Sequence, residues 1–249
     1  MAIGFDSGDV YIYDTTLTQT LTINAHTAPL QRIKYSSSNG YAVTCSNDNT
    51  AKVWNVASGW SLVATFTGHT DIVYGLEFIN DITMASSSQD GTVQVWRTTT
   101  GAYISHIDLT EGAQTIQLLP NGYLAVGLFF GNIKVYDVST GTLQATLSSH
   151  SMRVIDMAVS DDGKSPMLAS AGYDKIVIWD LSTNTVLYNF NGGNFLTFVF
   201  FFSNAYSIGL TTLRKYFDIS KMSFQFHLRS NGHHLSQDDH HFSASQLGL

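Results

Sequence analysis

The sequence is poor in charge and in cysteine, and it has no long apolar run. Charged residues make up 12% of its 249 residues, about half of the roughly 25% usual for soluble domains. The single cysteine, Cys45, excludes an internal disulfide framework. No run of about 20 apolar residues occurs, which argues against a membrane-spanning helix. Only 12 Lys and Arg against 19 Asp and Glu give a net charge of −7, which argues against a nucleic-acid surface.

Other absences narrow the class further. The N-terminal segment carries Asp6 where a signal peptide needs a basic and then an apolar stretch. One cysteine cannot supply a zinc site of cysteine pairs, and the C-terminal histidines (233–234 and 240–241) are interpreted as part of a polar tail. Aromatic and β-branched residues are abundant, which argues against disorder. We therefore expect an intracellular protein, cytoplasmic or nuclear, that is rich in strands and has no metal or cofactor.

What the sequence does contain is a repeat of 40 to 43 residues. Each unit ends in an aromatic residue that follows a short alternating run, which is typical of a β-strand. A second apolar pattern begins four residues after a histidine in three of the units. Turn residues separate the apolar runs, so each unit is predicted to hold four short strands. The unit endings are Tyr13-Asp14, Trp54-Asn55, Trp96-Arg97, Tyr136-Asp137 and Trp179-Asp180.

These residues resemble the WD40 repeat family, on the spacing, the histidine motif (as in Gly68-His69) and the aromatic-polar endings. The resemblance implies an all-β fold, a WD40-type β-propeller of about five to six blades with four antiparallel strands each. Residues 1–220 are predicted to form the propeller. The blades are expected near 1–24 (partial), 25–67, 68–109, 110–148, 149–191 and 194–232 (degenerate), and a polar tail without repeats is expected at 233–249.

The length raises the question of whether the propeller is complete. A seven-bladed ring would need roughly 290 residues, more than this chain has. Three alternatives are open: an open arc that is a fragment of a larger propeller, a six-bladed ring closed by a degenerate C-terminal strand, and a five-bladed ring in which residues 195–202 join the strands of residues 2–23. The fragment is the favoured interpretation.

A set of four polar residues recurs in three units at fixed spacing. The resemblance implies that each set is a structural hydrogen-bonded chain, since a buried imidazole, hydroxyl and indole all need partners. Ser, His and Asp also make a hydrolytic triad, but a catalytic set occurs once whereas this one follows the repeat. The sets are His26, Thr44, Asp48 and Trp54; His69, Ser86, Asp90 and Trp96; and His150, Ser170, Asp174 and Trp179.

One unit departs from this pattern. Residues 98–137 lack both the His and the Asp, and Phe130 stands in the Asp position. We expect apolar packing to hold this blade, and we expect it to be the least stable of the four full blades.

The predicted function is a non-catalytic scaffold for protein–protein interactions within a multiprotein complex. The alternative is a regulatory or recognition arm of an enzyme or of a larger multidomain protein; an RNA-binding propeller is less favoured because of the net charge. Binding residues tend to lie on loops that a rigid frame positions. The expected partners are proteins or peptides, not nucleic acid, membrane or metal. Candidate contacts on one face are Asn47, Asn49, Gln89, Phe129, Phe130, Tyr173 and Lys175.

Overall fold

The computed structural model describes residues 1–160, 166–191, 196–201 and 208–213, with side chains up to residue 190. These residues form strands and turns, which confirms the all-β prediction, and they include no helix long and apolar enough to cross a membrane. The chain divides into two compact units, Met1–Val154 and Ile155–Leu249. Each unit is built from antiparallel sheets whose strands follow one another in chain order.

The first unit contains one sheet of three strands and three sheets of four strands. The three-stranded sheet is β1 (Ala2–Gly4), β2 (Asp9–Tyr13) and β3 (Gln19–Asn24). The next is β4 (Leu30–Ser36), β5 (Tyr41–Ser46), β6 (Ala51–Asn55) and β7 (Ser61–Phe66). Then follow β8 (Val73–Asn80), β9 (Thr83–Ser88), β10 (Thr92–Arg97) and β11 (Tyr103–Asp108). The last is β12 (Ala113–Leu118), β13 (Leu124–Leu128), β14 (Asn132–Tyr136) and β15 (Leu143–Ser148).

The second unit takes in most of one four-stranded sheet and a strand pair. The sheet is β16 (Val154–Ser160), β17 (Met167–Gly172), β18 (Lys175–Asp180) and β19 (Thr185–Asn191), and the pair is β20 (Leu196–Phe201) and β21 (Ile208–Leu213). Ile155, Ala169, Ala171 and Ile178 form a small core within the sheet. β20 and β21 are the described part of the predicted degenerate blade (194–232), and the predicted tail at 233–249 lies outside the described residues.

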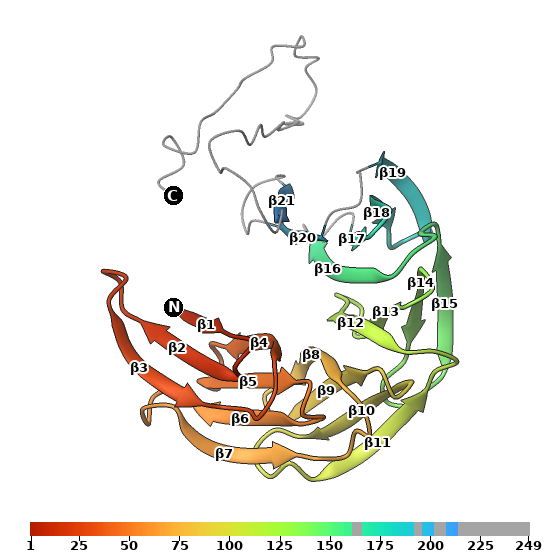
Figure 1. The fold of residues 1–249 in the computed structure, drawn as a ribbon. Helices are drawn as coiled ribbons and strands as arrows, with labels where there is room; N and C mark the ends of the chain where they lie inside the picture. Colours follow the sequence, from red (N-terminus) through yellow and green to blue (C-terminus); the bar gives the residue numbers. More distant parts are fainter. Residues whose placement is uncertain (161–165, 192–195, 202–207, 214–249) are drawn as a thin grey trace. The chain divides into compact units, whose positions relative to one another are not determined.

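In the first unit the sheets stand side by side as the blades of an incomplete WD40-type propeller. The first strands β4, β8 and β12 are neighbours, and the last strands β7, β11 and β15 lie along the other edge (Figure 1). The second strands are almost wholly buried, as in β9 and β13, because a neighbouring sheet covers each face. The last strands are largely exposed, as in β11 and β15. Burial on both faces explains why so few charged residues occur in the sequence.

Small side chains let neighbouring blades approach closely. A methyl group added at Gly75 would come within 2.3 Å of Ser87 Oγ and 3.2 Å of the backbone of Ile116, which belongs to the next blade. Larger side chains fill the wider spaces, and Phe66 of one blade stacks on Trp96 of the next with centroids 5.1 Å apart. Packing between blades therefore makes the larger cores of the first unit.

The turn that joins the second and third strands of a blade needs one left-handed residue. Asn49, Gly91 and Gly131 occupy this position in the three four-stranded sheets of the first unit, and Gly8 occupies the turn between β1 and β2 of the three-stranded sheet, with φ between 67° and 94°. Glycine adopts this conformation without strain, and asparagine tolerates it better than most residues do. Asn49 is therefore explained by the turn geometry, which the sequence interpretation as a contact residue did not consider.

Candidate functional site

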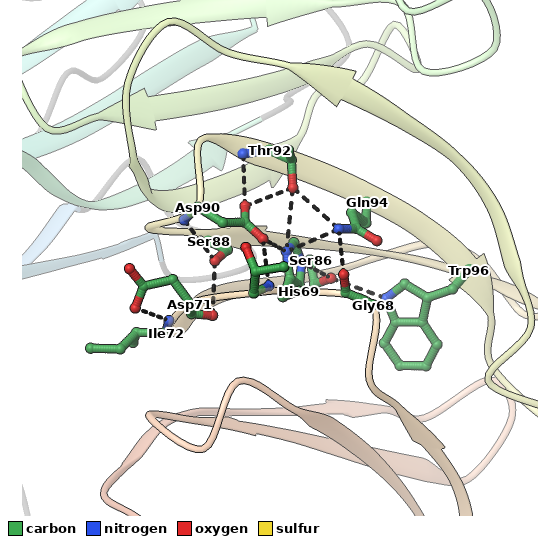
Figure 2. A network of polar contacts seen from close by, with 11 residues as sticks. Gly68, His69, Asp71, Ile72, Ser86, Ser88, Asp90, Thr92, Gln94 and Trp96 are labelled. Carbon is green, nitrogen blue, oxygen red and sulfur yellow. Dashed lines mark hydrogen bonds and ion pairs between the residues drawn. The ribbon is translucent and has the colours of Figure 1, made fainter.

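The polar set around His69 forms one continuous chain of hydrogen bonds (Figure 2). His69 Nδ1 lies 2.7 Å from Asp90 Oδ2, and His69 Nε2 lies 2.8 Å from Ser86 Oγ. The indole Nε1 of Trp96 donates to the same Ser86 oxygen at 3.2 Å. Assigning the imidazole proton to Nδ1 makes every group a donor or acceptor as its chemistry requires. The chain joins the turn before β8 to strands β9 and β10.

The set around His26 repeats this geometry in the preceding blade. His26 contacts Asp48 Oδ2 at 2.9 Å through Nδ1 and Thr44 Oγ1 at 2.7 Å through Nε2. Trp54 Nε1 donates to Thr44 Oγ1 at 2.9 Å. His26 is 6% exposed and Thr44 is fully buried. A buried network of this kind is stable only when each member has a partner, as each does in these two blades.

The carboxylates of these sets are held in the charged form. Burial by itself would raise the pKa of Asp90, but hydrogen bonds from His69, from the Thr92 hydroxyl and from the Thr70 N–H outweigh it and lower the pKa to about 2. Burial would likewise raise the pKa of Asp48. Hydrogen bonds from Thr50, Thr27 and His26 outweigh this effect and lower the pKa. Burial lowers the pKa of His26, because a charged imidazole loses more solvation than Asp48 returns.

The threonines in these networks were missed in the sequence. Thr50 Oγ1 donates to Asp48 Oδ1 at 2.6 Å, and Thr92 Oγ1 donates to Asp90 Oδ1 at 2.7 Å. A serine two residues before each aspartate accepts the backbone N–H of that aspartate. The signal was present as the pattern Ser-x-Asp-x-Thr, which occurs at residues 46–50 and 88–92.

The third set is divided between the two compact units. His150 belongs to the first unit and is 7% exposed, whereas Ser170, Asp174 and Trp179 belong to the second. Within the second unit, Trp179 Nε1 donates to Ser170 Oγ at 2.8 Å, as in the other blades. The indole-to-hydroxyl half of the set is therefore present.

In the blade of β12 to β15, apolar residues replace the whole polar set. Val126 stands where Thr44 and Ser86 stand in the other blades, and Tyr136 stands in place of the tryptophan. Both are buried in one apolar cluster, and Leu109 packs against it from the histidine position. Glu111 takes over part of the connection, because its Oε2 accepts the backbone N–H of Phe130 at 2.6 Å. The loss of the polar set is thus coordinated across four positions.

The Ser86–His69–Asp90 order has triad-like distances, but its surroundings do not suit catalysis. Ser86 is fully buried and its oxygen already accepts the Trp96 indole N–H. A nucleophile must reach a substrate carbonyl, which a hydroxyl in this position does not do. Cys45 is also buried, and burial raises the pKa of its thiol to about 12, so the reactive thiolate is disfavoured. Among the described residues no cluster of His, Cys, Asp or Glu could hold a metal ion.

The end of the first unit that carries the second-to-third-strand turns is called the turn face below; it comprises residues 47–50, 89–91 and 129–131. The two phenylalanines of this face differ sharply. Phe129 is partly buried, with the Arg153 guanidinium 3.6 Å from its ring centroid and the ring of Tyr74 edge-on at 5.7 Å. Phe130 is 76% exposed. An exposed ring beside a rigid aromatic and guanidinium cluster is a composition enriched in protein interfaces.

The remaining candidates serve the frame to different degrees. Asn47 accepts a hydrogen bond from Gln31 at 2.6 Å, and Gln89 accepts one from the Tyr74 hydroxyl at 2.9 Å. Asn49 is the left-handed residue of its turn. Tyr173 and Lys175 lie in the second unit, where Tyr173 packs against the core of its sheet. The other five candidates lie on the turn face of the first unit; they are Asn47, Asn49, Gln89, Phe129 and Phe130.

Comparison with known proteins gives one family. The family model described as "WD domain, G-beta repeat" matches residues 17–55, 60–97 and 141–180. Periodic tryptophan protein 2 of Arabidopsis thaliana is 30% identical over 181 residues, covering 70% of this chain and 20% of that protein. The U3 small nucleolar RNA-associated protein 15 homolog of Xenopus laevis is 24% identical over 196 residues, covering 77% and 38%. Eukaryotic translation initiation factor 3 subunit I of Aspergillus oryzae is 24% identical over 141 residues, covering 54% and 42%. The chain thus spans one fifth to about two fifths of the length of these relatives.

Proposed function

Because this chain belongs to the WD40 repeat family, we propose that it is a non-catalytic, intracellular scaffold whose turn face binds other proteins within a multiprotein complex. One of its relatives is named as a subunit of a translation initiation factor, and another is named as a protein associated with the U3 small nucleolar RNA. The polar networks fit a structural role, since their reactive groups are buried and satisfied. The frame would then position the turns, where binding residues are expected.

The observation that carries this proposal is the exposure of Phe130. Large apolar side chains that stand free on a polar turn are poorly solvated, and their burial by a partner is favourable. The backbone N–H of Phe130 donates to Glu111, so the turn that carries the ring is held in place. Phe129 and Arg153 beneath the turn add to this rigidity. A turn that is already ordered loses little backbone entropy when a partner binds.

Substitution of Phe130 tests the turn face. Affinity purification of the Phe130→Ala variant is expected to lose partner proteins that the unchanged chain retains, with recovery lowered about tenfold, as for an interface hot spot. Quantitative mass spectrometry of the purified material measures the recovery. The matched control is Tyr35→Ala, because Tyr35 is 57% exposed and lies at the other end of its blade. An unchanged profile for Phe130→Ala, or an equal loss for Tyr35→Ala, would contradict the proposal.

The alternative function is a regulatory or recognition arm. In that case the repeats would serve one enzyme or one larger multidomain protein, whereas a scaffold would hold several partners together. The partial coverage of the relatives is compatible with it. The same purification separates the two, because a recognition arm is expected to recover one catalytic partner in stoichiometric amount.

A further inference from the structure

A groove lies at the end of the blades that is opposite to the turn face, between the sheet of β8 to β11 and the sheet of β12 to β15. Its cavity volume is about 530 Å³. The first-to-second-strand turn and the third-to-fourth-strand turn of a blade share this end, because the strands are antiparallel. Residues of both blades line it, among them Ile79, Val95, Ile104, Tyr123, Asp137 and Val138.

The walls of this groove are mainly apolar. Ile79 and Val95 come from one blade, and Tyr123 and Val138 come from the next. Ile104 on β11 is 45% exposed although it faces the groove. The groove is open to solvent along its length, which suits an extended segment of a partner better than an enclosed small molecule. The groove therefore offers apolar surface that a partner could cover.

Asp137 is the charged residue in the lining. Its Oδ1 accepts the Ser139 N–H at 2.8 Å and the Ser139 hydroxyl at 2.7 Å. The hydrogen bonds from the Ser139 side chain and backbone lower the pKa of Asp137, so the carboxylate is charged at neutral pH. A positively charged group would complement it, and the net charge of −7 attracts basic segments to this chain in general.

We propose that this groove docks a short basic-apolar peptide segment of a partner protein, with an apolar side chain between Ile104 and Val138 and a lysine or arginine beside Asp137. A second copy of this chain suits the groove less well, because two chains of charge −7 repel each other. The docking site is separate from the turn face, so it stands or falls independently of the function proposed above.

Peptide selection against the purified full chain tests the proposal. A phage-displayed library of random dodecapeptides is expected to yield sequences with an aliphatic or aromatic residue next to arginine or lysine. The most enriched peptide, synthesised with a fluorescent label, is expected to bind about fivefold more weakly to Asp137→Asn, the scale of an exposed ion pair. Ile104→Ser is expected to weaken binding about tenfold through lost apolar contact.

The chain offers matched controls for the charge. Asp14 and Asp180 make the same turn as Asp137, each accepting the N–H and hydroxyl of the residue two positions later. Asparagine keeps the acceptor oxygen in all three turns, so these substitutions remove charge and leave the turn hydrogen bonds possible. Asp14→Asn, Asp180→Asn and Phe130→Ala are expected to bind the labelled peptide as the unchanged chain does.

Several outcomes would overturn the proposal. Selection without enrichment, or enrichment of peptides that lack a basic residue, would do so. Equal affinity of the unchanged chain and Asp137→Asn would also do so, as would an equal loss in Asp180→Asn. A dimer in light scattering whose contact is lost in Ile104→Ser would assign the groove to a second copy and likewise overturn it.

Discussion

At the residue scale, the four-residue sets show how one side chain satisfies several others. Thr44 and Ser86 each accept an indole N–H and contact an imidazole, so one small hydroxyl meets the needs of two large buried groups. The aspartate then fixes the imidazole and the turn N–H groups together. The loss of a single member destabilises the blade, because the remaining groups stay buried and unsatisfied.

The lowered pKa of Asp90 predicts an acid-dependent loss of stability. The pKa is about 2 in the folded chain and 3.8 in the reference state, so the unfolded state binds the proton first as the pH falls. The contribution of the ionised carboxylate is complete above about pH 4 and is lost as the pH falls towards 2. The difference in free energy of unfolding between the unchanged chain and Asp90→Asn is expected to shrink by about 1–2 kcal/mol over this range, after allowance for solvent screening.

Urea unfolding at pH 7, 4, 3 and 2 measures this difference. Asp48→Asn provides the comparison, since the pKa of Asp48 is lowered by equivalent hydrogen bonds and the same direction is expected. A difference that stays constant from pH 7 to pH 2 would show that Asp90 carries no linked proton.

At the element scale, each compared blade of the first unit has either the complete polar set or a complete apolar replacement. Two blades have the histidine, hydroxyl, aspartate and tryptophan together, and the blade of β12 to β15 has Leu109, Val126, Phe130 and Tyr136 in the same positions. A partial set would leave a buried polar group without a partner, which costs more than a complete set or none. The expectation that the apolar blade is the least stable stays a prediction.

Exchanging a hydroxyl for a methyl group, or the reverse, at one register position is expected to destabilise both the blades that have the polar set and the blade that lacks it. Thr44→Val leaves the His26 and Trp54 nitrogens unpaired, and Val126→Thr buries a hydroxyl with no histidine or tryptophan to receive it. Each is expected to lower the free energy of unfolding by about 1–3 kcal/mol. Chemical denaturation measures both, with exposed Ser61→Ala as the control. A neutral or stabilising Val126→Thr would contradict the account of coordinated replacement.

At the scale of the whole molecule, electrostatics favours basic protein segments over nucleic acid as partners. The net charge is −7, and Lys34 is engaged by the largely buried Glu77 of the neighbouring blade at 2.5 Å. Burial raises the pKa of Glu77, although Lys34 opposes this. Binding to a polyanion depends on several free cations on one surface.

The whole chain is therefore expected to pass through a heparin column at low ionic strength without retention. A basic protein of similar mass serves as the control that the column binds under the same conditions. Retention that falls as salt is raised would instead indicate a local basic patch and would favour the RNA-binding alternative.

By itself the sequence determined the strand periodicity and the repeat, and it pointed to the His, Ser or Thr, Asp and Trp positions of the polar sets. These features are encoded by residues close together in one repeat, and the same pattern recurs in several repeats of the sequence. The tertiary structure decided that Phe130 stands free while Phe129 lies under Arg153, that Lys34 meets Glu77, and that a groove opens between two blades. Each of these features involves residues of different repeats or opposite sides of one turn. Each therefore depends on how neighbouring blades pack. No periodicity within a single repeat encodes that packing.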